Sequence, residues 1–145
     1  MTASAESEHL FVYGTLRRAI AAGPYPELNR HARYLGTARV AGRLYDLGRY
    51  PGLVPSDDPA DRVCGEIYRL RRAAHVLALL DDYEGCSARF APPHEYRRAW
   101  LGATLASGAE QPAWVYLLNH QPAAATRIPG DDYLTYLNSP APQAR

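Results

Sequence analysis

A glutamate lies where the apolar face of a predicted helix should continue. The apolar residues of this helix recur at the spacing i, i+3, i+4 and i+7, in the order Ala73, Val76, Leu77 and Leu80. One turn further along the same face is Glu84, near the end of the segment HVLALLDDYEGC. Burial and the negative end of the helix dipole both disfavour a charged carboxylate, so we expect a raised pKa for Glu84. Such a carboxyl group can accept and return a proton at neutral pH, which makes Glu84 a candidate catalytic residue.

A structural role for Glu84 is the alternative. A glutamate at a helix end commonly reaches water or pairs with an arginine. Against this, an inward position at the negative end of a helix is a locally unfavourable choice for a carboxylate. Choices of this kind are expected at functional sites more than elsewhere.

The second candidate is a turn after the first predicted strand, in the sequence VYGTLRR. The apolar run ends at Tyr13, so the backbone N–H groups of Gly14, Thr15 and Leu16 are expected to be free of sheet partners. Successive free amides form a concave site for a carboxylate or an oxyanion, and the two arginines that follow would add positive charge. The same residues also fit a plain turn that binds nothing.

The bulk composition argues against several other classes of function. A chain of 145 residues suits one domain with one core, which we place at residues 9–139, between a flexible leader at 1–8 and a tail at 140–145. The net charge of +1 and the charged fraction of 21% give no sign of a nucleic-acid or polyanion partner. No apolar run reaches the roughly 18 residues that span a membrane, and the N-terminal residues lack the apolar stretch of a signal peptide. We therefore expect a cytoplasmic protein with no membrane partner.

Cysteine and histidine spacing gives no support for a metal or cofactor site. Cys64 and Cys86 are expected to be free thiols in a reducing cytosol. The five histidines are scattered singly, and the chain has no zinc-type Cys/His spacing, no GxGxxG motif and no P-loop. We expect neither a metal nor a cofactor.

Strands dominate the rest of the pattern. They are expected at residues 9–13, 40–47, 63–70, 95–107 and 112–119, the last two joined by a turn around Gly108. Segments 14–36 and 48–61 contain several prolines and glycines and are expected to be loops. The second and third strands share the patterns VAGRLYDL and VCGEIYRL, in which Gly42 and Gly65 suggest a bend or a bulge at a barrel corner.

Two helices complete the pattern. The central helix is expected over residues 71–84, with Gly85 as the residue that ends it. Asp131 is expected to cap a short late helix. This order of elements predicts an α+β domain on a mixed or antiparallel sheet that curls towards a barrel.

Four segments of the chain resemble the γ-glutamylcyclotransferase-like family, in its AIG2-like and γ-glutamylamine cyclotransferase branch. They are FVYGTLRR, GRLYDLGRYPGLVPS, VCGEIYRL and LDDYEG, and their order and spacing match over residues 10–118. YGTL alone has little specificity, whereas its combination with the second and fourth segments is specific. The resemblance implies a small mixed β-barrel of about six strands, with a flanking central helix, short extra helices and a cavity at the barrel mouth.

The resemblance also implies a reaction and a set of site residues. The α-amine of a small-molecule γ-glutamyl amide attacks the δ-carbonyl, and 5-oxoproline and a free amine are released without a cofactor. Glu84 is implied as the acid and base catalyst. The implied substrate-binding residues are Tyr13, Gly14, Thr15 and Leu16, together with the cavity candidates Tyr50 and Tyr96. Ordinary barrel aromatics are an equally good reading of the last two.

Two rival functions stay open at the level of sequence. One is a non-catalytic module on the same fold, in which the cavity binds a small acidic ligand or a loop of a partner, because fold does not fix function. The other is a thiol enzyme that uses Cys86 with His94, although nothing in the sequence holds these two side chains together. Neither the leaving amine nor the choice between monomer and homodimer follows from the sequence.

Overall fold

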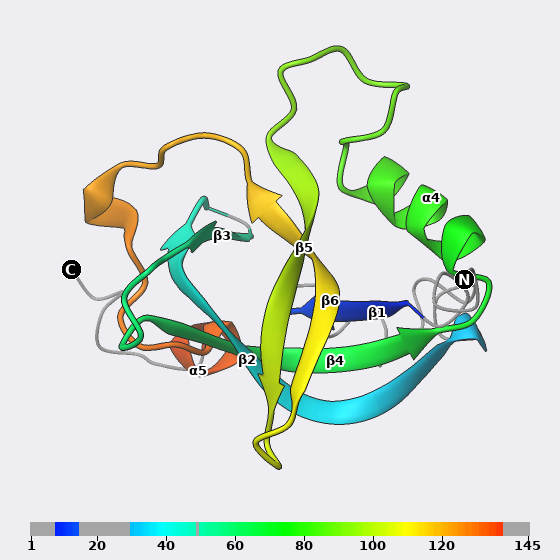
Figure 1. The fold of residues 1–145 in the computed structure, drawn as a ribbon. Coiled ribbons are helices and arrows are strands. Elements are labelled where there is room, and N and C mark those ends of the chain that lie inside the picture. Colours follow the sequence, from blue (N-terminus) through cyan, green and yellow to red (C-terminus); the bar gives the residue numbers. More distant parts are fainter. Residues whose placement is uncertain (1–7, 15–29, 49, 138–145) are drawn as a thin grey trace.

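The fold is taken from a computed structural model of the chain, which describes residues 8–14, 30–48 and 50–137 (Figure 1). Most of the predicted leader and the whole predicted tail lie outside these residues. The elements within them are β1 (His9–Val12), β2 (Ala32–Asp46), β3 (Pro51–Pro55), β4 (Arg62–Leu70), α4 (Ala73–Tyr83), β5 (Tyr96–Leu105), β6 (Glu110–Leu118), the 3₁₀ helix η1 (Ala124–Thr126) and α5 (Tyr133–Leu137). Among the described residues, no helix has the length and apolarity that a membrane span needs.

Five strands close into a barrel. The sheet order is β3-β2-β4-β1-β6-β5, and β2 also pairs with β5, which completes a ring from which β3 is left out. β1 runs parallel to β6, whereas the other neighbouring strands are antiparallel. The predicted α+β class and the small mixed barrel with a central helix are confirmed. The β5–β6 hairpin also has its turn at Gly108, as predicted.

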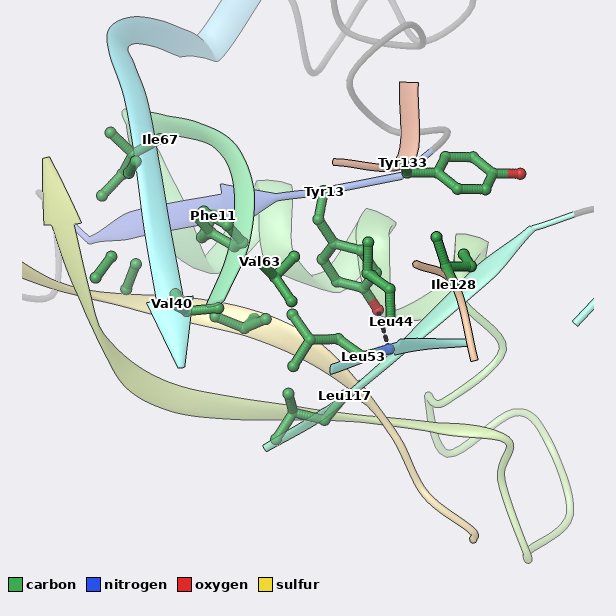
Figure 2. Close-up of a cluster of buried hydrophobic side chains, with 14 residues drawn as sticks. Phe11, Tyr13, Val40, Leu44, Leu53, Val63, Ile67, Leu117, Ile128 and Tyr133 are labelled. Carbon is green, nitrogen blue, oxygen red and sulfur yellow. Dashed lines mark hydrogen bonds between the residues drawn. The ribbon is translucent and has the colours of Figure 1, made fainter. Parts of the chain in front are cut away.

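The alternation of side chains along the strands gives the barrel two buried layers. Phe11 and Tyr13 belong to the inner layer, which Figure 2 shows. Leu10 and Val12, which alternate with them along the chain, lie on the outer side of the sheet. The buried face of α4 packs on that outer side and consists of the predicted residues Ala73, Val76, Leu77 and Leu80. The sequence periodicity therefore identified the face by which α4 is held on the barrel.

The predicted loop at residues 48–61 was wrong in part, because it contains β3. A turn at Gly48, where φ is +110°, brings the Leu47 N–H to the Tyr50 carbonyl oxygen at 3.0 Å and sends the chain back along β2. β3 is an edge strand with a proline at each end, and edge positions tolerate the loss of a backbone donor. The prolines therefore led to the prediction of a loop where the chain forms β3, one side of the candidate site.

The start of β2 was also misplaced by the sequence analysis. The described end of the predicted loop at residues 14–36 is already strand from Ala32, where β2 pairs with β4. One residue is bulged out between Tyr34 and Gly36, and Gly36 has φ +129°. This bulge breaks the regular alternation that would have revealed the strand.

Of the bend or bulge predicted at Gly42 and Gly65, the bulge is absent, because no register shift occurs at either residue. Gly42 lies where β2 ends its pairing with β4, at Ala41, and begins its pairing with β3. Gly65 is needed for a different reason: a Cβ atom there would lie 2.3 Å from the Val12 carbonyl oxygen on β1. The glycine lets two neighbouring strands of the barrel approach closely.

The cap of the late helix lies one residue after the predicted position. Asp132, not Asp131, accepts hydrogen bonds at Oδ1 from the N–H groups of Leu134 at 2.9 Å and Thr135 at 3.3 Å. Two adjacent aspartates are equivalent as sequence signals, so only the backbone decides which one caps the helix.

Candidate active site

Glu84 lies at the C-terminal end of α4. It caps the helix with φ −83° and ψ −4°, and its N–H donates to the Leu80 carbonyl oxygen at 2.8 Å. Gly85 follows with φ +73°, the left-handed conformation that ends the helix, as the sequence predicted. The helix itself begins at Ala73 rather than at residue 71.

Asp81, one turn before Glu84, ties the end of α4 to two strands. Arg98 of β5 donates to it in a bidentate pair, from Nε at 2.8 Å and Nη2 at 3.1 Å. The hydroxyl of Tyr116 on β6 also donates to Asp81 Oδ1, at 2.7 Å. Charge-assisted bidentate pairs have a defined geometry, so these bonds fix the helix end that carries Glu84. Sequence analysis missed this role because the partners are 17 and 35 residues away and their pairing depends on the barrel.

The ends of α4 and β1 and the start of β3 border a cavity of about 460 Å³. Five predicted site residues line it, namely Tyr13, Gly14, Tyr50, Glu84 and Tyr96. Thr15 and Leu16, whose amides were predicted to bind substrate, lie outside the described residues. The lining residues that sequence analysis did not find are Phe11, Val12, Pro51, Asp82, Tyr83, Gly85, Phe90, Glu95 and Tyr116.

The surroundings of Glu84 favour its neutral form. Burial raises the pKa of Glu84 from its ordinary 4.5 to about 7, and the negative charges of Asp81 and Glu95 act in the same direction. Among the described residues, the Glu84 carboxylate has no hydrogen-bond or ion-pair partner. The direction of the shift agrees with the sequence-based expectation, and the carboxyl group is left free to exchange a proton with a molecule in the cavity.

The hydroxyl of Tyr13 is occupied by the barrel itself. It donates to the Tyr116 carbonyl oxygen at 2.6 Å. It also accepts from the Leu53 N–H at 3.2 Å, the hydrogen bond drawn in Figure 2. Burial and the nearby charge of Glu84 raise the pKa of Tyr13. This hydroxyl therefore holds β3 against the barrel, and any contact of Tyr13 with a ligand is left to its ring and backbone.

Tyr96 secures β3 in a similar way, because its hydroxyl donates to the Pro51 carbonyl oxygen at 2.6 Å. The position of Pro51 in turn explains Gly14, where a Cβ atom would lie 2.7 Å from Pro51 Cγ. The backbone of Gly14 thus borders the cavity at a point where any larger residue would displace β3.

The more exposed side of the cavity is formed by Tyr50 and Glu95. The Tyr50 hydroxyl donates to Glu95 Oε1 at 2.8 Å, and the ring of Tyr50 lies 6.1 Å from that of Tyr96. Sequence analysis proposed Tyr50 and Tyr96 as cavity residues, and both border the cavity. Glu95 had no signal of its own, because it is an isolated acid that directly precedes β5.

Comparison with known proteins identifies the family to which the chain belongs. A family model described as "Gamma-glutamyl cyclotransferase, AIG2-like" matches residues 10–135. The chain belongs to this family. It is 36% identical over 113 residues, which is 76% of this chain and 82% of the other, to a Vibrio cholerae protein named "Putative gamma-glutamylcyclotransferase". The family inferred from the four sequence motifs is confirmed.

Solved structures of AIG2-like and other proteins share the fold. A crystal structure of an AIG2-like protein from Mus musculus has a TM-score of 0.67 and 25% identity, and the match covers 88% of each chain. An uncharacterised protein from Pyrococcus horikoshii has a TM-score of 0.59 over 88% of this chain and 90% of that one. At 22% identity, the second likeness concerns the fold alone.

The rival thiol site does not coincide with the cavity of Glu84. Cys86 and His94 border a second cavity, and no hydrogen bond joins them within the described residues. Burial, with the charges of Asp81 and Glu84, raises the pKa of the Cys86 thiol to about 11. A thiolate is the reactive form of cysteine, so this environment disfavours Cys86 as a nucleophile. Cys64 and Cys86 are both free, as predicted.

Proposed function

We propose that the chain catalyses the cyclisation of a γ-glutamyl amide, with release of 5-oxoproline and a free amine. Glu84 is the acid and base of this reaction. One observation carries the proposal: the Glu84 carboxyl group lines a cavity, has no pairing partner among the described residues and has a pKa near 7. Those are the properties that a group needs to take up and release a proton at neutral pH.

The reaction needs few protein groups because the nucleophile is part of the substrate. The α-amine attacks the δ-carbon, a new C–N bond closes the five-membered ring, and the C–N bond to the leaving amine breaks. Holding the amine and the carbonyl in the right geometry recovers ~7–11 kcal/mol of the barrier in well-oriented intramolecular reactions. A cavity lined by a carboxyl group that can take up and release a proton therefore meets the needs of this reaction.

Proton transfers complete the balance of the reaction. The α-ammonium group loses two protons in forming the ring amide, and the leaving nitrogen gains two in becoming an ammonium ion. Glu84 takes one proton from the attacking nitrogen and returns it to the leaving nitrogen, and the other exchanges through solvent. Acid and base assistance of this kind is worth roughly 10²–10⁴-fold in rate.

Substrate binding is assigned to the backbone at Gly14 and to the aromatic walls. Amides from Gly14 onwards, including those of Thr15 and Leu16, hold the α-carboxylate or the oxyanion. Tyr50 and Phe90 border the exposed side of the cavity, where the stem of the leaving amine passes out. The ring of Tyr96 contacts the ring of Tyr50 and so supports this side of the cavity.

The test is product analysis with a panel of γ-glutamyl amides that differ only in the leaving amine. Mass spectrometry is expected to find 5-oxoproline and the free amine in equal amounts from at least one member. The matched controls are the α-glutamyl isomer, whose amine is not bound to the δ-carbon, and the N-acetylated substrate, whose α-nitrogen is no longer a nucleophile; neither is expected to release its amine by ring closure. Saturable binding of the panel without any 5-oxoproline would contradict the proposal and would leave a binding module.

A further inference from the structure

A group of basic residues surrounds another cavity, which is distinct from the two described above and lies where β2 begins and β4 ends. Arg33 of β2 stands directly opposite Arg69 of β4 in the antiparallel register. The Arg71 N–H donates to the His31 carbonyl oxygen at 2.8 Å, so these two residues form the next pair along the same strands. Together with Arg30 and Ala32, the four residues line a cavity of about 570 Å³. It shares no lining residue with the cavity of Glu84.

This arrangement is electrostatically unfavourable in the absence of a ligand. Directly opposed side chains on antiparallel strands have Cβ atoms roughly 4.5–5.5 Å apart, and like charges in such a pair are destabilising. His9 of β1 is opposite Arg69 on its other side, and burial together with the charge of Arg69 lowers the pKa of His9. A row of basic side chains thus crosses three neighbouring strands.

Acidic residues that would neutralise this row are missing from the described part of the chain. Arg33, Arg69 and Arg71 form no ion pair with any described carboxylate. Glu8, which directly precedes β1 and His9, instead accepts a hydrogen bond from the Trp114 indole at 2.9 Å. The first turn of α4, which follows Arg71, also contains no acid. The near-neutral net charge of the chain conceals this local excess of positive charge.

We propose that this basic pocket, formed by His31, Arg33, Arg69 and Arg71, binds a small phosphate-bearing anion. Guanidinium groups present planar pairs of N–H donors that match two phosphate oxygens, and several arginines from different strands favour an anion with more than one negative charge. A bound phosphate group relieves the repulsion between Arg33 and Arg69. The site is separate from that of the proposed cyclisation, because the two cavities have no lining residue in common.

Thermal unfolding in the presence of pyrophosphate tests the site. The wild-type chain is expected to show a saturable rise of a few degrees in Tm with up to about 10 mM pyrophosphate, compared with sodium chloride at the same ionic strength. The double variant Arg33→Gln/Arg69→Gln is expected to bind at least about 100-fold more weakly in calorimetry, because each arginine contributes a charge-assisted bond worth about tenfold or more. Without pyrophosphate its Tm is expected to equal or exceed that of the wild type, since the repulsion is gone.

A matched control separates a site from general attraction of anions. Arg62→Gln/Arg97→Gln removes the same charge from two exposed arginines outside this pocket and is expected to keep the pyrophosphate response. An equal loss of response in both double variants, or no saturable response of the wild type, would overturn the proposal. A response to a short single-stranded RNA far greater than that to pyrophosphate would overturn the assignment to a small anion.

Discussion

At the residue scale, the behaviour of Glu84 depends on three features of its surroundings. Burial is the main cause of its raised pKa, and the charges of Asp81 and Glu95 contribute further. Asp81 is neutralised in part by Arg98. Among the described residues, the Glu95 carboxylate has only the hydrogen bond from Tyr50 and a 3.7 Å contact with His120 Nε2. Glu95 is therefore the charge that can be removed with the least structural effect.

The pH dependence of turnover is the first prediction at this scale. Because Glu84 must be a carboxylate to accept the first proton, kcat/KM on a γ-glutamyl amide is expected to fall as the pH decreases through about 7. In Glu95→Gln, one source of negative charge is gone, the pKa of Glu84 decreases, and this acidic limb is expected to move to lower pH. Glutamine still accepts the hydrogen bond from Tyr50, so the cavity wall keeps its shape.

Comparison of the two enzymes on the same substrate isolates the protein group. The α-amine of the substrate also titrates, but it contributes identically to both profiles. Superimposable acidic limbs in the wild type and Glu95→Gln would show that a group other than Glu84 controls the limb. Complete loss of activity in Glu95→Gln would instead identify Glu95 as the acid and base.

At the element scale, Asp61 joins three segments that surround β3. Its carboxylate accepts from Arg43 of β2 at 2.7 Å, from the Ser56 hydroxyl at 2.8 Å and from Arg127 after η1 at 3.0 Å. The bonds from Arg43 and Ser56 are the main causes that lower the pKa of Asp61 from its ordinary 3.8 to about 2. Asp61 thereby ties the end of β3 to β2 and to the segment that follows η1.

Asp61→Asn is expected to reduce stability in a pH-dependent way. A carboxyl group with a lowered folded-state pKa stabilises the fold above its ordinary pKa, and this contribution is lost as the pH falls towards the folded-state value. The urea midpoint of the wild type is therefore expected to exceed that of the variant at pH 7, with the difference shrinking between about pH 4 and pH 2. Asp57→Asn is the matched control, because the exposed Asp57 has no ion pair among the described residues. A difference between wild type and Asp61→Asn that is the same at every pH would exclude the charge as its cause.

The elements that sequence could predict are those with a clear repeat. The stripe of α4 and the alternation of β4, β5 and β6 gave the right elements, because packing on one face dictates both patterns. β3 was missed since two prolines and a glycine in five residues look like a loop, and its edge position permits them. The start of β2 was missed because of its bulge at Leu35.

The same distinction applies to the residues of the candidate site. Glu84 was found because a carboxylate interrupts an apolar stripe, and Tyr13, Gly14, Tyr50 and Tyr96 because they stand in family motifs. Asp81, Glu95 and Tyr116 were missed because their roles depend on contacts between α4, β5 and β6 that no local pattern encodes. Sequence therefore predicted which group could transfer a proton, but not which groups hold it and set its pKa.

At the scale of the whole molecule, the packed interior of the barrel and the candidate active site are in different places. The interior is filled by the residues of Figure 2, including Leu44, Leu53 and Ile67. The cavity lies instead where α4, β1 and β3 meet, and hydroxyl groups of Tyr13 and Tyr96 lock β3 to that junction. A firmly packed body thus carries the buried, unpaired carboxyl group of Glu84 at its edge.

The central claim is that the Glu84 carboxyl group transfers the protons of a cyclisation, and the rate of 5-oxoproline formation by Glu84→Gln tests it most directly. Glutamine keeps the volume and most of the hydrogen-bonding capacity but cannot shuttle a proton. On the best substrate of the panel, kcat per folded molecule is expected to fall by ~10²–10⁴-fold with little change in substrate affinity. The Tm is expected to be unchanged or higher, because an unpaired, buried charge has been removed. A variant that forms 5-oxoproline at the wild-type rate per folded molecule would contradict the account.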